Sequence, residues 1–306
     1  MEKRLLLLLN PYAGQRRANR VLPEILRTML DAGYRCETYV TGGRGDATRF
    51  ARNYAAEFDR IVCVGGDGTL NETIAGLMQS GADTPLGYIP SGSTNDFAAT
   101  LGLSGDPVTA AGDAVRCEPR PIDIGSFNGR CFIYTASCGA FTRVSYTAPQ
   151  NVKNTLGHAA YVLEGLRDLR SLRPYSLRVE LGGQVLQGDF IFMSVTNSTS
   201  VGGILKLDAA QVSLNDGRFE VLLIKNPVNP SQLSSIVRSL TLMEFPDEMI
   251  TFTTAERVVV EADPSTEWTL DGEHQPGAQH IEMQNLHSAV RIAMPRLPHG
   301  LEEEMQ

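Results

Sequence analysis

One run of twelve residues, 61–72, constrains the fold of this chain most: Ile-Val-Cys-Val-Gly-Gly-Asp-Gly-Thr-Leu-Asn-Glu. Its first four residues predict a buried β-strand that stops at a Gly-Gly turn, and a helix opens at about Thr69. Because three of the four residues 65–68 are glycine, backbone N–H groups can approach a polyphosphate closely. Asp67 stands where a carboxylate can meet a magnesium ion held by those phosphates. Taken alone, the run is equally compatible with a Gly-rich bend that binds nothing.

Size and composition favour a two-domain globular protein. The 306 residues, 42% of them hydrophobic, suffice for two domains with full cores. A net charge of −8 argues against nucleic acid as a partner. The five scattered cysteines form no C-x-x-C pair, which favours free thiols in a reducing cytoplasm over disulfides or zinc.

The amino-terminal apolar run 5–9 predicts a buried strand. It is shorter than the roughly seven to fifteen apolar residues of a signal peptide. No stretch of the chain approaches the ~18 apolar residues of a spanning helix. We therefore expect a cytoplasmic protein that meets a membrane only peripherally, at its inner face.

Strand and helix patterns alternate through the first half of the chain. Strands are expected at 5–9, 35–40, 61–64 and 86–89, with helices following each, one of them capped by Asp46 and running to about Phe58. Such alternation predicts a parallel α/β sheet wound by right-handed crossovers. In these sheets ligands bind beyond the carboxyl ends of the strands. Asn10, Thr41 and the segments 65–69 and 91–96 all fall at that edge, which predicts a nucleotide site.

From about Ile122 the pattern changes to antiparallel strands. Asn128-Gly129 between two apolar runs predicts a type I′ hairpin. Further strands are expected at 130–136, 176–181, 184–196, 218–224, 257–261, 267–270, 280–283 and 289–293, with helices near 156–172 and 231–242. The predicted organisation is an α/β domain over 1–121, an antiparallel β domain over 122–296 and a polar tail over 297–306.

Two acidic turns in the second half are candidate functional sites. They are Asn215-Asp216-Gly217 and Asp271-Gly272-Glu273. Each alone would most often be an exposed turn in which the side chain bonds the backbone.

With these pieces placed, the sequence resembles the bacterial diacylglycerol kinase and related lipid kinase family. The resemblance spans nearly the whole chain in the family's order and is carried by the segments 10–14 (NPYAG), 65–72 (GGDGTLNE), 90–98 (PSGSTNDFA), 215–217 (NDG) and 270–273 (LDGE). The GGDGT pattern is shared with NAD kinases, whereas the segment 91–98 is more specific. Ser93 stands where the family usually has Thr and keeps the hydroxyl. Arg16, Arg17 and Arg20 replace lysines, so a phosphate contact there is as plausible as a solvated helix turn.

The resemblance implies an ATP-binding α/β domain packed on a lipid-binding β-sandwich domain, with the active site in the cleft between them. Carried over residue by residue, it implies ATP contacts from Asn10, Pro11, Gly14, Thr41, Gly65, Gly66, Asp67, Gly68, Thr69, Asn71, Glu72, Gly92, Ser93 and Asn95. Asp67 and Asp96 would organise the magnesium end of the nucleotide.

The resemblance also implies roles for acidic residues of the second half. Asp216, with the backbone carbonyls of Ser213 and Arg218, would hold a structural metal. Asp123 and Asp216 would belong to an acidic network that joins the domains. Asp271 and Glu273 would be the candidate general bases, and we favour Glu273.

The expected reaction is ATP- and Mg²⁺-dependent phosphorylation of a lipid hydroxyl at the membrane surface, with diacylglycerol as the favoured acceptor. A NAD kinase-like phosphotransferase is the alternative, and a non-catalytic nucleotide-binding module at the membrane is a third. Lys153, Arg167, Arg170 and Arg173 suit anionic lipid, although a solvated helix face is favoured. The sequence leaves the oligomeric state open, a homodimer being one option.

Overall fold

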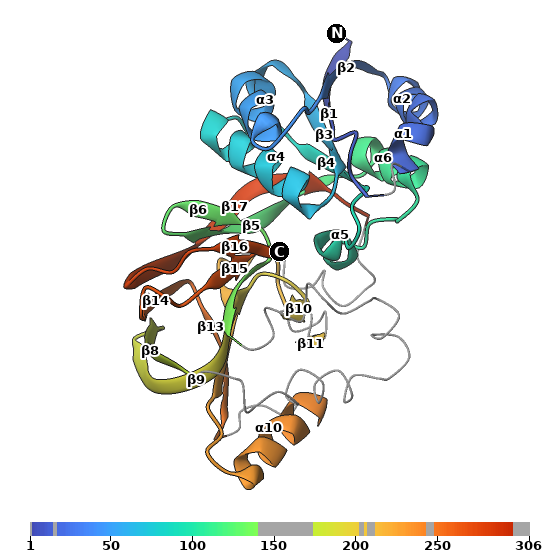
Figure 1. Cartoon of the computed structure of the whole chain (residues 1–306). Coiled ribbons are helices and arrows are strands. Elements are labelled where there is room, and N and C mark those ends of the chain that lie inside the picture. The colour runs from blue at the N-terminus through green and yellow to red at the C-terminus, as the bar shows by residue number, and fades with distance from the viewer. Residues whose placement is uncertain are drawn as a thin grey trace. The chain divides into compact units, whose positions relative to one another are not determined.

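The computed structural model describes residues 2–14, 17–139, 174–201, 205–206, 212–242 and 248–295 (Figure 1). It divides the chain into two compact units: unit 1 comprises Met1–Ile124 with His287–Gln306, and unit 2 comprises Gly125–Leu286. Arg16, the side chain of Arg17, the predicted helix at 156–172 with its basic residues, and the tail 297–306 lie outside the described residues.

Unit 1 contains a parallel sheet whose strands were expected from the sequence. Its strands lie in the order β2-β1-β3-β4, and their bounds are β1 Lys3–Leu9, β2 Tyr34–Val40, β3 Arg60–Gly65 and β4 Leu86–Pro90. All three neighbouring pairs are parallel. The side chains of Leu5, Leu6, Leu7 and Leu8 are all inaccessible to solvent, as expected for a central strand covered on both faces.

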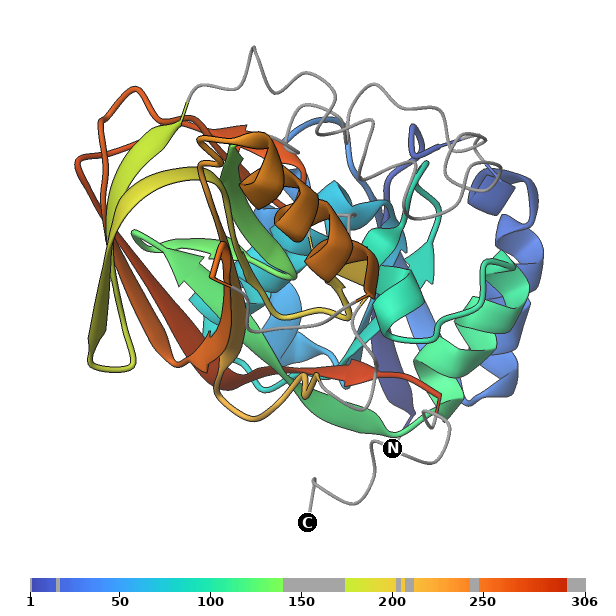
Figure 2. The same cartoon turned by 90° about the horizontal axis from the view of Figure 1, so that it is seen from below.

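Helices cover both faces of this sheet. They are α1 Arg17–Arg20, α2 Leu22–Asp31, α3 Asp46–Tyr54, α4 Asp67–Ser80, α5 Asp96–Thr100 and α6 Pro107–Arg116. Helices α2 and α6 contact each other, and so do α3 and α4; Figure 2 shows α2 beside α6. Alternate strand residues serve the two sides, because Leu5, Leu7 and Leu9 pack with Ile25 and Met29 of α2 in one core cluster.

The strand order contains a reversal that predicts where a ligand binds. From β1 the chain winds to β2 on one side, and β3 and β4 then follow on the other side. In open α/β sheets the crevice at such a reversal, beyond the carboxyl ends of the strands, is the usual ligand site. Here it lies between the loops that follow β1 and β3, which begin at Asn10 and Gly66.

Unit 2 is built from antiparallel strands and one described helix. The strands are β5 Pro119–Phe127, which begins in unit 1, β6 Arg130–Phe132, β7 Thr135–Gly139, β8 Tyr175–Leu181, β9 Gln184–Thr196, β10 Ser200–Val201, β11 Leu205–Lys206, β12 Phe219–Lys225, β13 Ile250–Ala255, β14 Arg257–Glu261, β15 Trp268–Leu270, β16 Glu273–Gln275 and β17 His280–Ala293, which ends in unit 1; the helix is α10 Pro230–Leu242.

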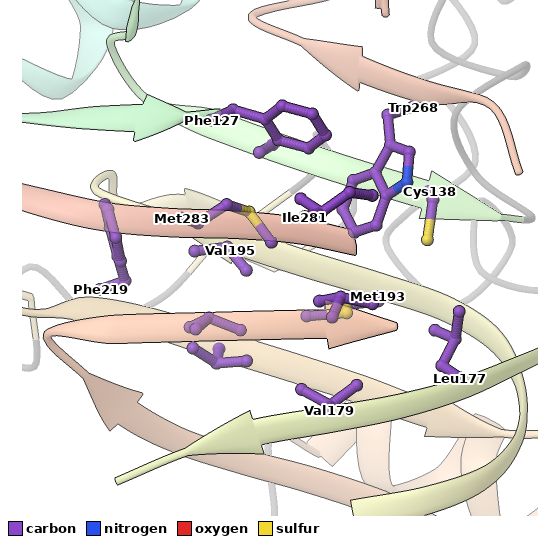
Figure 3. Close-up of a cluster of buried hydrophobic side chains, with 14 of the residues drawn as sticks. Phe127, Cys138, Leu177, Val179, Met193, Val195, Phe219, Trp268, Ile281 and Met283 are labelled. Carbon is purple, nitrogen blue, oxygen red and sulfur yellow. The ribbon is translucent and has the colours of Figure 1, made fainter. Parts of the chain in front are cut away.

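Strand β9 belongs to two layers of unit 2. Its first half pairs with β8, and its second half pairs with β7 and β12. Between the layers lies a core that includes Trp268, Met193 and Met283 (Figure 3). The rings of Phe127 and Trp268 meet edge to face with centroids 5.4 Å apart. The α/β plus β-sandwich fold that the resemblance implied is therefore the fold of the chain.

Several local expectations differ from the structure. Asp46 is the first residue of α3 rather than its cap: Gly45 is the N-cap, and the Asp46 Oδ2 accepts the N–H groups of Gly42 and Gly43. That helix ends at Tyr54, before a 3₁₀ turn at Ala55–Glu57. Strands β10, β11, β13 and β16 were not expected.

The predicted strand at 130–136 is divided into β6 and β7. The N–H groups of Ile133 and Tyr134 donate to Asp271 instead of continuing a strand ladder. Conversely, the strands predicted at 280–283 and 289–293 form one strand, β17. Ser288 within it adopts a positive φ of 53°, and its N–H donates to Asp123, so the strand continues through a local kink.

The limits of the units also differ from the predicted domains. The predicted boundaries fall near 121 and 296, whereas the units divide within β5, at Ile124–Gly125, and within β17, at Leu286–His287. The cause is that β17 runs through the second boundary. Its end pairs with β4, Ile292 opposite Leu86.

Candidate active site

Hydrogen bonds join the loop after β1 to the end of β3 and the start of α4. The side-chain amide of Asn10 donates from Nδ2 to Oγ1 of Thr69 over 2.9 Å, and its backbone N–H donates to the carbonyl of Val64. The Asn10 Oδ1 accepts the N–H of Tyr12. The next residue, Pro11, offers its carbonyl to the side-chain amide of Asn19. Asn10 and Pro11 therefore shape the crevice wall through hydrogen bonds of their own.

The turn after β3 leads directly into the longest helix of unit 1. The N-cap of α4 is Gly66, which has no side chain to cap the first turn. The first N–H groups of a helix point along its axis and carry a partial positive charge, so this end suits a phosphate. Gly65 allows the first turn of α4 to pack closely against the end of β3, because a Cβ on Gly65 would lie 2.5 Å from the Cβ of Thr69.

The loop after β4 closes on the same place. The N–H of Ser91 donates to the carbonyl of Gly65 over 2.7 Å. Asn95, with a φ of 52°, accepts the Gly92 N–H at its Oδ1 and donates from Nδ2 to the Gly92 carbonyl. This closed ring of hydrogen bonds holds the loop in one shape.

Glycines bring these three loops into backbone contact. A Cβ on Gly92 would lie 2.6 Å from the Cα of Gly66, and a Cβ on Gly66 would lie 3.0 Å from the Cα of Gly92. Gly14, with a φ of +48°, leaves only 2.4 Å between a Cβ and the carbonyl oxygen of Ser91. No larger residue fits at these positions without separating the loops. We call this three-loop junction the cradle (10–14, 65–69 and 91–96).

Two carboxylates belong to the cradle, and a phenol of β4 contacts it. Asp67 is 9% exposed, and its Oδ2 accepts the N–H of Asp96 over 3.1 Å. Tyr88 of β4 lies beneath, its hydroxyl 3.5 Å from the Oδ1 of Asn95. Burial, and then the charge of Asp67, raises the pKa of Tyr88 far above its ordinary value. Tyr88 therefore remains a neutral hydrogen-bond donor beneath the loop.

Other residues predicted to contact ATP lie around the cradle. Thr41 is buried, and its hydroxyl donates to the carbonyl of Leu9. Glu72 accepts the N–H of Gly45 at its Oε1 over 2.7 Å, so it holds the loop after β2 against α4. Asn71 is half-buried, while Gly68 and Ser93 are exposed. The ATP contacts of these five residues, like those of the cradle residues, remain predictions.

In unit 2, Asp271 occupies a tight hairpin turn. Asp271 and Gly272 have φ values of 49° and 81°, and Leu270 pairs with Glu273 across them, as in a type I′ turn between β15 and β16. The Asp271 carboxylate accepts three backbone N–H groups, from Ile133 at 2.7 Å, Tyr134 at 2.9 Å and Thr135 at 3.1 Å. These bonds fix both oxygens, which suits an anchor better than a mobile base.

Glu273 has a different environment. Its side chain is 46% exposed, and its Oε2 lies 3.0 Å from Nη2 of Arg130. A second nitrogen of the same guanidinium, Nη1, donates to the Oε1 of Gln275 over 2.7 Å. A carboxylate that is this accessible can approach a substrate hydroxyl.

The turn predicted to hold a structural metal forms hydrogen bonds of its own. The Asp216 Oδ1 accepts the N–H of Arg218 over 2.9 Å, and the carbonyl of Arg218 accepts the side-chain amide of Asn285. In the described part of the chain, no group of three or more His, Cys, Asp or Glu side chains could hold a metal ion. One carboxylate with the carbonyls of Ser213 and Arg218 is compatible with a weak oxygen-ligand site. The metal there remains a prediction.

Asp123 is fully buried beside the point where the chain leaves unit 1. Its Oδ1 accepts the N–H of Ser288 over 2.7 Å and lies 3.0 Å from Nδ1 of His287. Tyr88, Arg130 and His287 all support a predicted site residue, yet none belongs to a recognised motif. Their roles depend on contacts between elements distant in sequence.

Two family models match the chain. The model described as the diacylglycerol kinase catalytic domain matches residues 4–127, and the one described as the YegS C-terminal NAD kinase beta sandwich-like domain matches residues 135–294. Together they span both units.

Known proteins are similar along almost the whole chain. A diacylglycerol kinase of Bacillus subtilis (strain 168) is 38% identical over 300 residues, covering 96% of this chain and 97% of that protein. One of Staphylococcus haemolyticus is 30% identical and covers 97% and 89%. A solved structure from Bacillus anthracis strain Sterne matches with a TM-score of 0.75 and 26% identity, covering 96% of this chain and 95% of that one. A diacylglycerol kinase structure from the same strain, 23% identical, shares the fold with a TM-score of 0.72, covering 96% and 97%.

Proposed function

This chain belongs to the diacylglycerol kinase family of lipid kinases, and from that membership we propose that it transfers the γ-phosphoryl group of ATP to a lipid hydroxyl, with diacylglycerol as the favoured acceptor. The observation that carries the proposal is the cradle, where Gly66 and Gly92 lie back to back beside the uncapped first turn of α4. Such a junction offers main-chain N–H donors to a polyphosphate, as phosphoryl transfer requires.

The cradle also suits the cation that accompanies a nucleotide. Asp67 and Asp96 are joined by a hydrogen bond and supply carboxylate oxygens, the donors that Mg²⁺ prefers. When bound, the ion would neutralise charge on the phosphate oxygens. The residues of the cradle themselves orient the phosphates and fix the loop geometry.

The acceptor side of the reaction falls to unit 2. In the proposed step the lipid oxygen bonds to the γ-phosphorus, the bond from that phosphorus to the β–γ bridging oxygen breaks, and the hydroxyl proton passes to Glu273. Asp271 is the less suitable base because its carboxylate already accepts three main-chain N–H groups. We assign it to holding the β15–β16 turn in place.

Contact with a membrane follows from the acceptor. Diacylglycerol resides in the bilayer, and within the described residues no helix is long and apolar enough to span one. We infer peripheral association, which vesicle co-sedimentation at low and high salt measures. A protein that stays in the supernatant under both conditions, while still phosphorylating lipid in detergent micelles, would contradict peripheral association.

A phosphotransfer assay tests the function. Purified protein is given radiolabelled ATP and Mg²⁺ with a panel of diacylglycerol, monoacylglycerol, sphingosine and ceramide in mixed micelles, and NAD in a separate arm. We expect a labelled lipid, diacylglycerol giving the highest rate. Label only in NADP would favour the NAD kinase-like alternative, and ATP binding without transfer to any acceptor would favour a non-catalytic module.

A further inference from the structure

Two tight hairpins of unit 2 present charged residues to each other. The β5–β6 turn is Asn128-Gly129, with φ values of 47° and 83°, and the β15–β16 turn is Asp271-Gly272, with φ values of 49° and 81°. The residue after the first turn is Arg130 and the residue after the second is Glu273, and the two form an ion pair over 3.0 Å. The same position of each hairpin therefore supplies one partner.

Arg130 binds two residues of β16 through separate nitrogens. Its Nη2 contacts the Oε2 of Glu273, and its Nη1 donates to the Oε1 of Gln275 over 2.7 Å. Residues two apart in a strand project from the same face, so one planar guanidinium can span both. The bond to Gln275 fixes the orientation of the guanidinium, and thereby the direction from which Nη2 contacts the Glu273 carboxylate.

Both hairpins are anchored on the unit 2 framework. Asn128 exchanges backbone and side-chain hydrogen bonds with Glu282, at 2.9 Å and 2.8 Å, and donates from Nδ2 to the carbonyl of His280 over 3.1 Å. The second turn is held by the three N–H groups that donate to Asp271. Arg130 and Glu273 therefore extend from fixed backbone positions, as a preorganised site requires.

The ion pair between Arg130 and Glu273 is too exposed for a contribution to folding stability to explain it. The side chains of Arg130 and Glu273 are 38% and 46% exposed, and ion pairs of this kind contribute little to folding. Exposure also leaves the carboxylate accessible to a substrate. A role in orienting Glu273 explains the geometry better than a role in folding.

We propose that Arg130 is a positioning residue for Glu273, and this inference rests on the proposed lipid kinase function. The guanidinium donates to one carboxylate oxygen and holds Glu273 in the orientation that accepts the hydroxyl proton. Arg130 itself need not touch the substrate. Removing Arg130 should therefore lower kcat only in protein that retains Glu273.

A double-mutant cycle tests the proposal, with kcat and KM for ATP and lipid measured for each variant. Arg130→Gln is expected to lower kcat about tenfold, the effect of one oriented charge-assisted hydrogen bond, with KM for ATP within about twofold. Arg130→Lys keeps the cation but loses the fork, so it is expected to retain more activity than Arg130→Gln. Added to Glu273→Gln, Arg130→Gln is expected to cause less than a further twofold loss.

Arg257→Gln provides the matched control. Arg257 pairs with Glu282 over 2.6 Å, with both side chains about as exposed as the first pair. It lies in β14, which pairs with β8 and β17, whereas β16 pairs with β15. We expect its kcat to stay within about twofold of wild type. Thermal unfolding of every variant shows whether a loss of activity reflects a loss of fold.

Three results would overturn the assignment while leaving the kinase function intact. They are an unchanged kcat in Arg130→Gln, a raised kcat, which would mean that the pair restrains the base, and a tenfold loss that persists in the Glu273→Gln background, which would place Arg130 on the substrate. If wild type phosphorylates no lipid, the proposed function fails and this inference fails with it.

Discussion

Gly66 and Gly92 show how single residues define the shape of the cradle. A Cβ on Gly92 would lie 2.6 Å from the Cα of Gly66, closer than side chains and backbone approach in proteins. Gly92→Ala must therefore separate the loops after β3 and β4. We expect ATP binding, measured by calorimetry with Mg²⁺, to weaken at least about tenfold, because the main-chain N–H groups no longer converge.

Gly112→Ala is the control for that substitution. Gly112 lies within α6, and a Cβ there would meet only the flexible Nη1 of Arg116 at 3.2 Å. Because alanine is the better helix former, this variant should bind ATP normally and be stabilised by about 0.5–1 kcal/mol. Equal ATP affinity in Gly92→Ala and Gly112→Ala would contradict a phosphate site at the cradle.

Substitutions of Asp271 and Glu273 are predicted to affect different properties: the first lowers stability and the second lowers kcat. Asp271→Ala leaves the N–H groups of residues 133–135 without their acceptor, so we expect unfolding free energy to fall by about 2 kcal/mol. Glu273→Gln removes an exposed charge, so stability should stay within about 1 kcal/mol while kcat falls at least about 100-fold. Urea unfolding and steady-state kinetics on both variants separate the two roles. Full turnover in Glu273→Gln would refute the choice of base.

The motif residues could be predicted from the sequence, but the residues that contact and support them, such as Arg130 and Tyr88, could not. Glycines followed by Asp67 after an apolar run indicate a phosphate loop because the backbone must approach a ligand. Nothing local marks Arg130, whose partner Glu273 is 143 positions away along the chain. No local pattern marks Tyr88 either, since an aromatic residue within an apolar strand also suits a core.

At the scale of elements, the start of α6 predicts a pH dependence of stability. Asp106 is its N-cap, and its Oδ2 accepts both the N–H and the hydroxyl of Thr109 at 2.8 Å. These bonds lower the pKa of Asp106 below its ordinary 3.8. Because the folded pKa is depressed, the stabilisation is present above the unfolded value and is lost as the pH falls through the folded value.

Comparing Asp106→Ala with Asp106→Asn measures this effect. Urea midpoints should be lower for Asp106→Ala than for wild type at pH 7, and the difference should shrink as the pH falls below 3.8. Asparagine keeps a side-chain oxygen that can cap the helix and does not titrate. Any difference in urea midpoint between Asp106→Asn and wild type should therefore reflect the loss of the charge and not the loss of the cap. A gap between wild type and Asp106→Ala that is constant with pH would contradict the ionised cap.

Periodicity predicted most elements and failed where side chains redirect the backbone. The strands of the parallel sheet are apolar and buried on both faces, so their pattern is unambiguous. In contrast, Asp271 draws away two N–H groups between β6 and β7, and Asp123 accepts the N–H of Ser288 within β17. These carboxylates lie far along the chain from the residues they bind, which local patterns cannot represent.

At the scale of the whole molecule, unit 2 is an insertion within unit 1. The chain leaves unit 1 in β5 and returns in β17, and Asp123 of β5 is bound to His287 and Ser288 of β17 inside unit 1. Sequence patterns predicted two consecutive domains because a strand that returns to an earlier sheet has no distinct composition. The fold class could be predicted, but the discontinuity of unit 1 could not.

The measurement that tests the central claim most directly is amide hydrogen exchange of the wild-type protein with and without Mg²⁺ and ADP. If the cradle holds the nucleotide phosphates, exchange should slow on nucleotide addition in the peptides that contain residues 65–69 and 91–96. Unchanged exchange in both segments, with slowing confined to unit 2, would contradict a phosphate site at the carboxyl ends of β3 and β4.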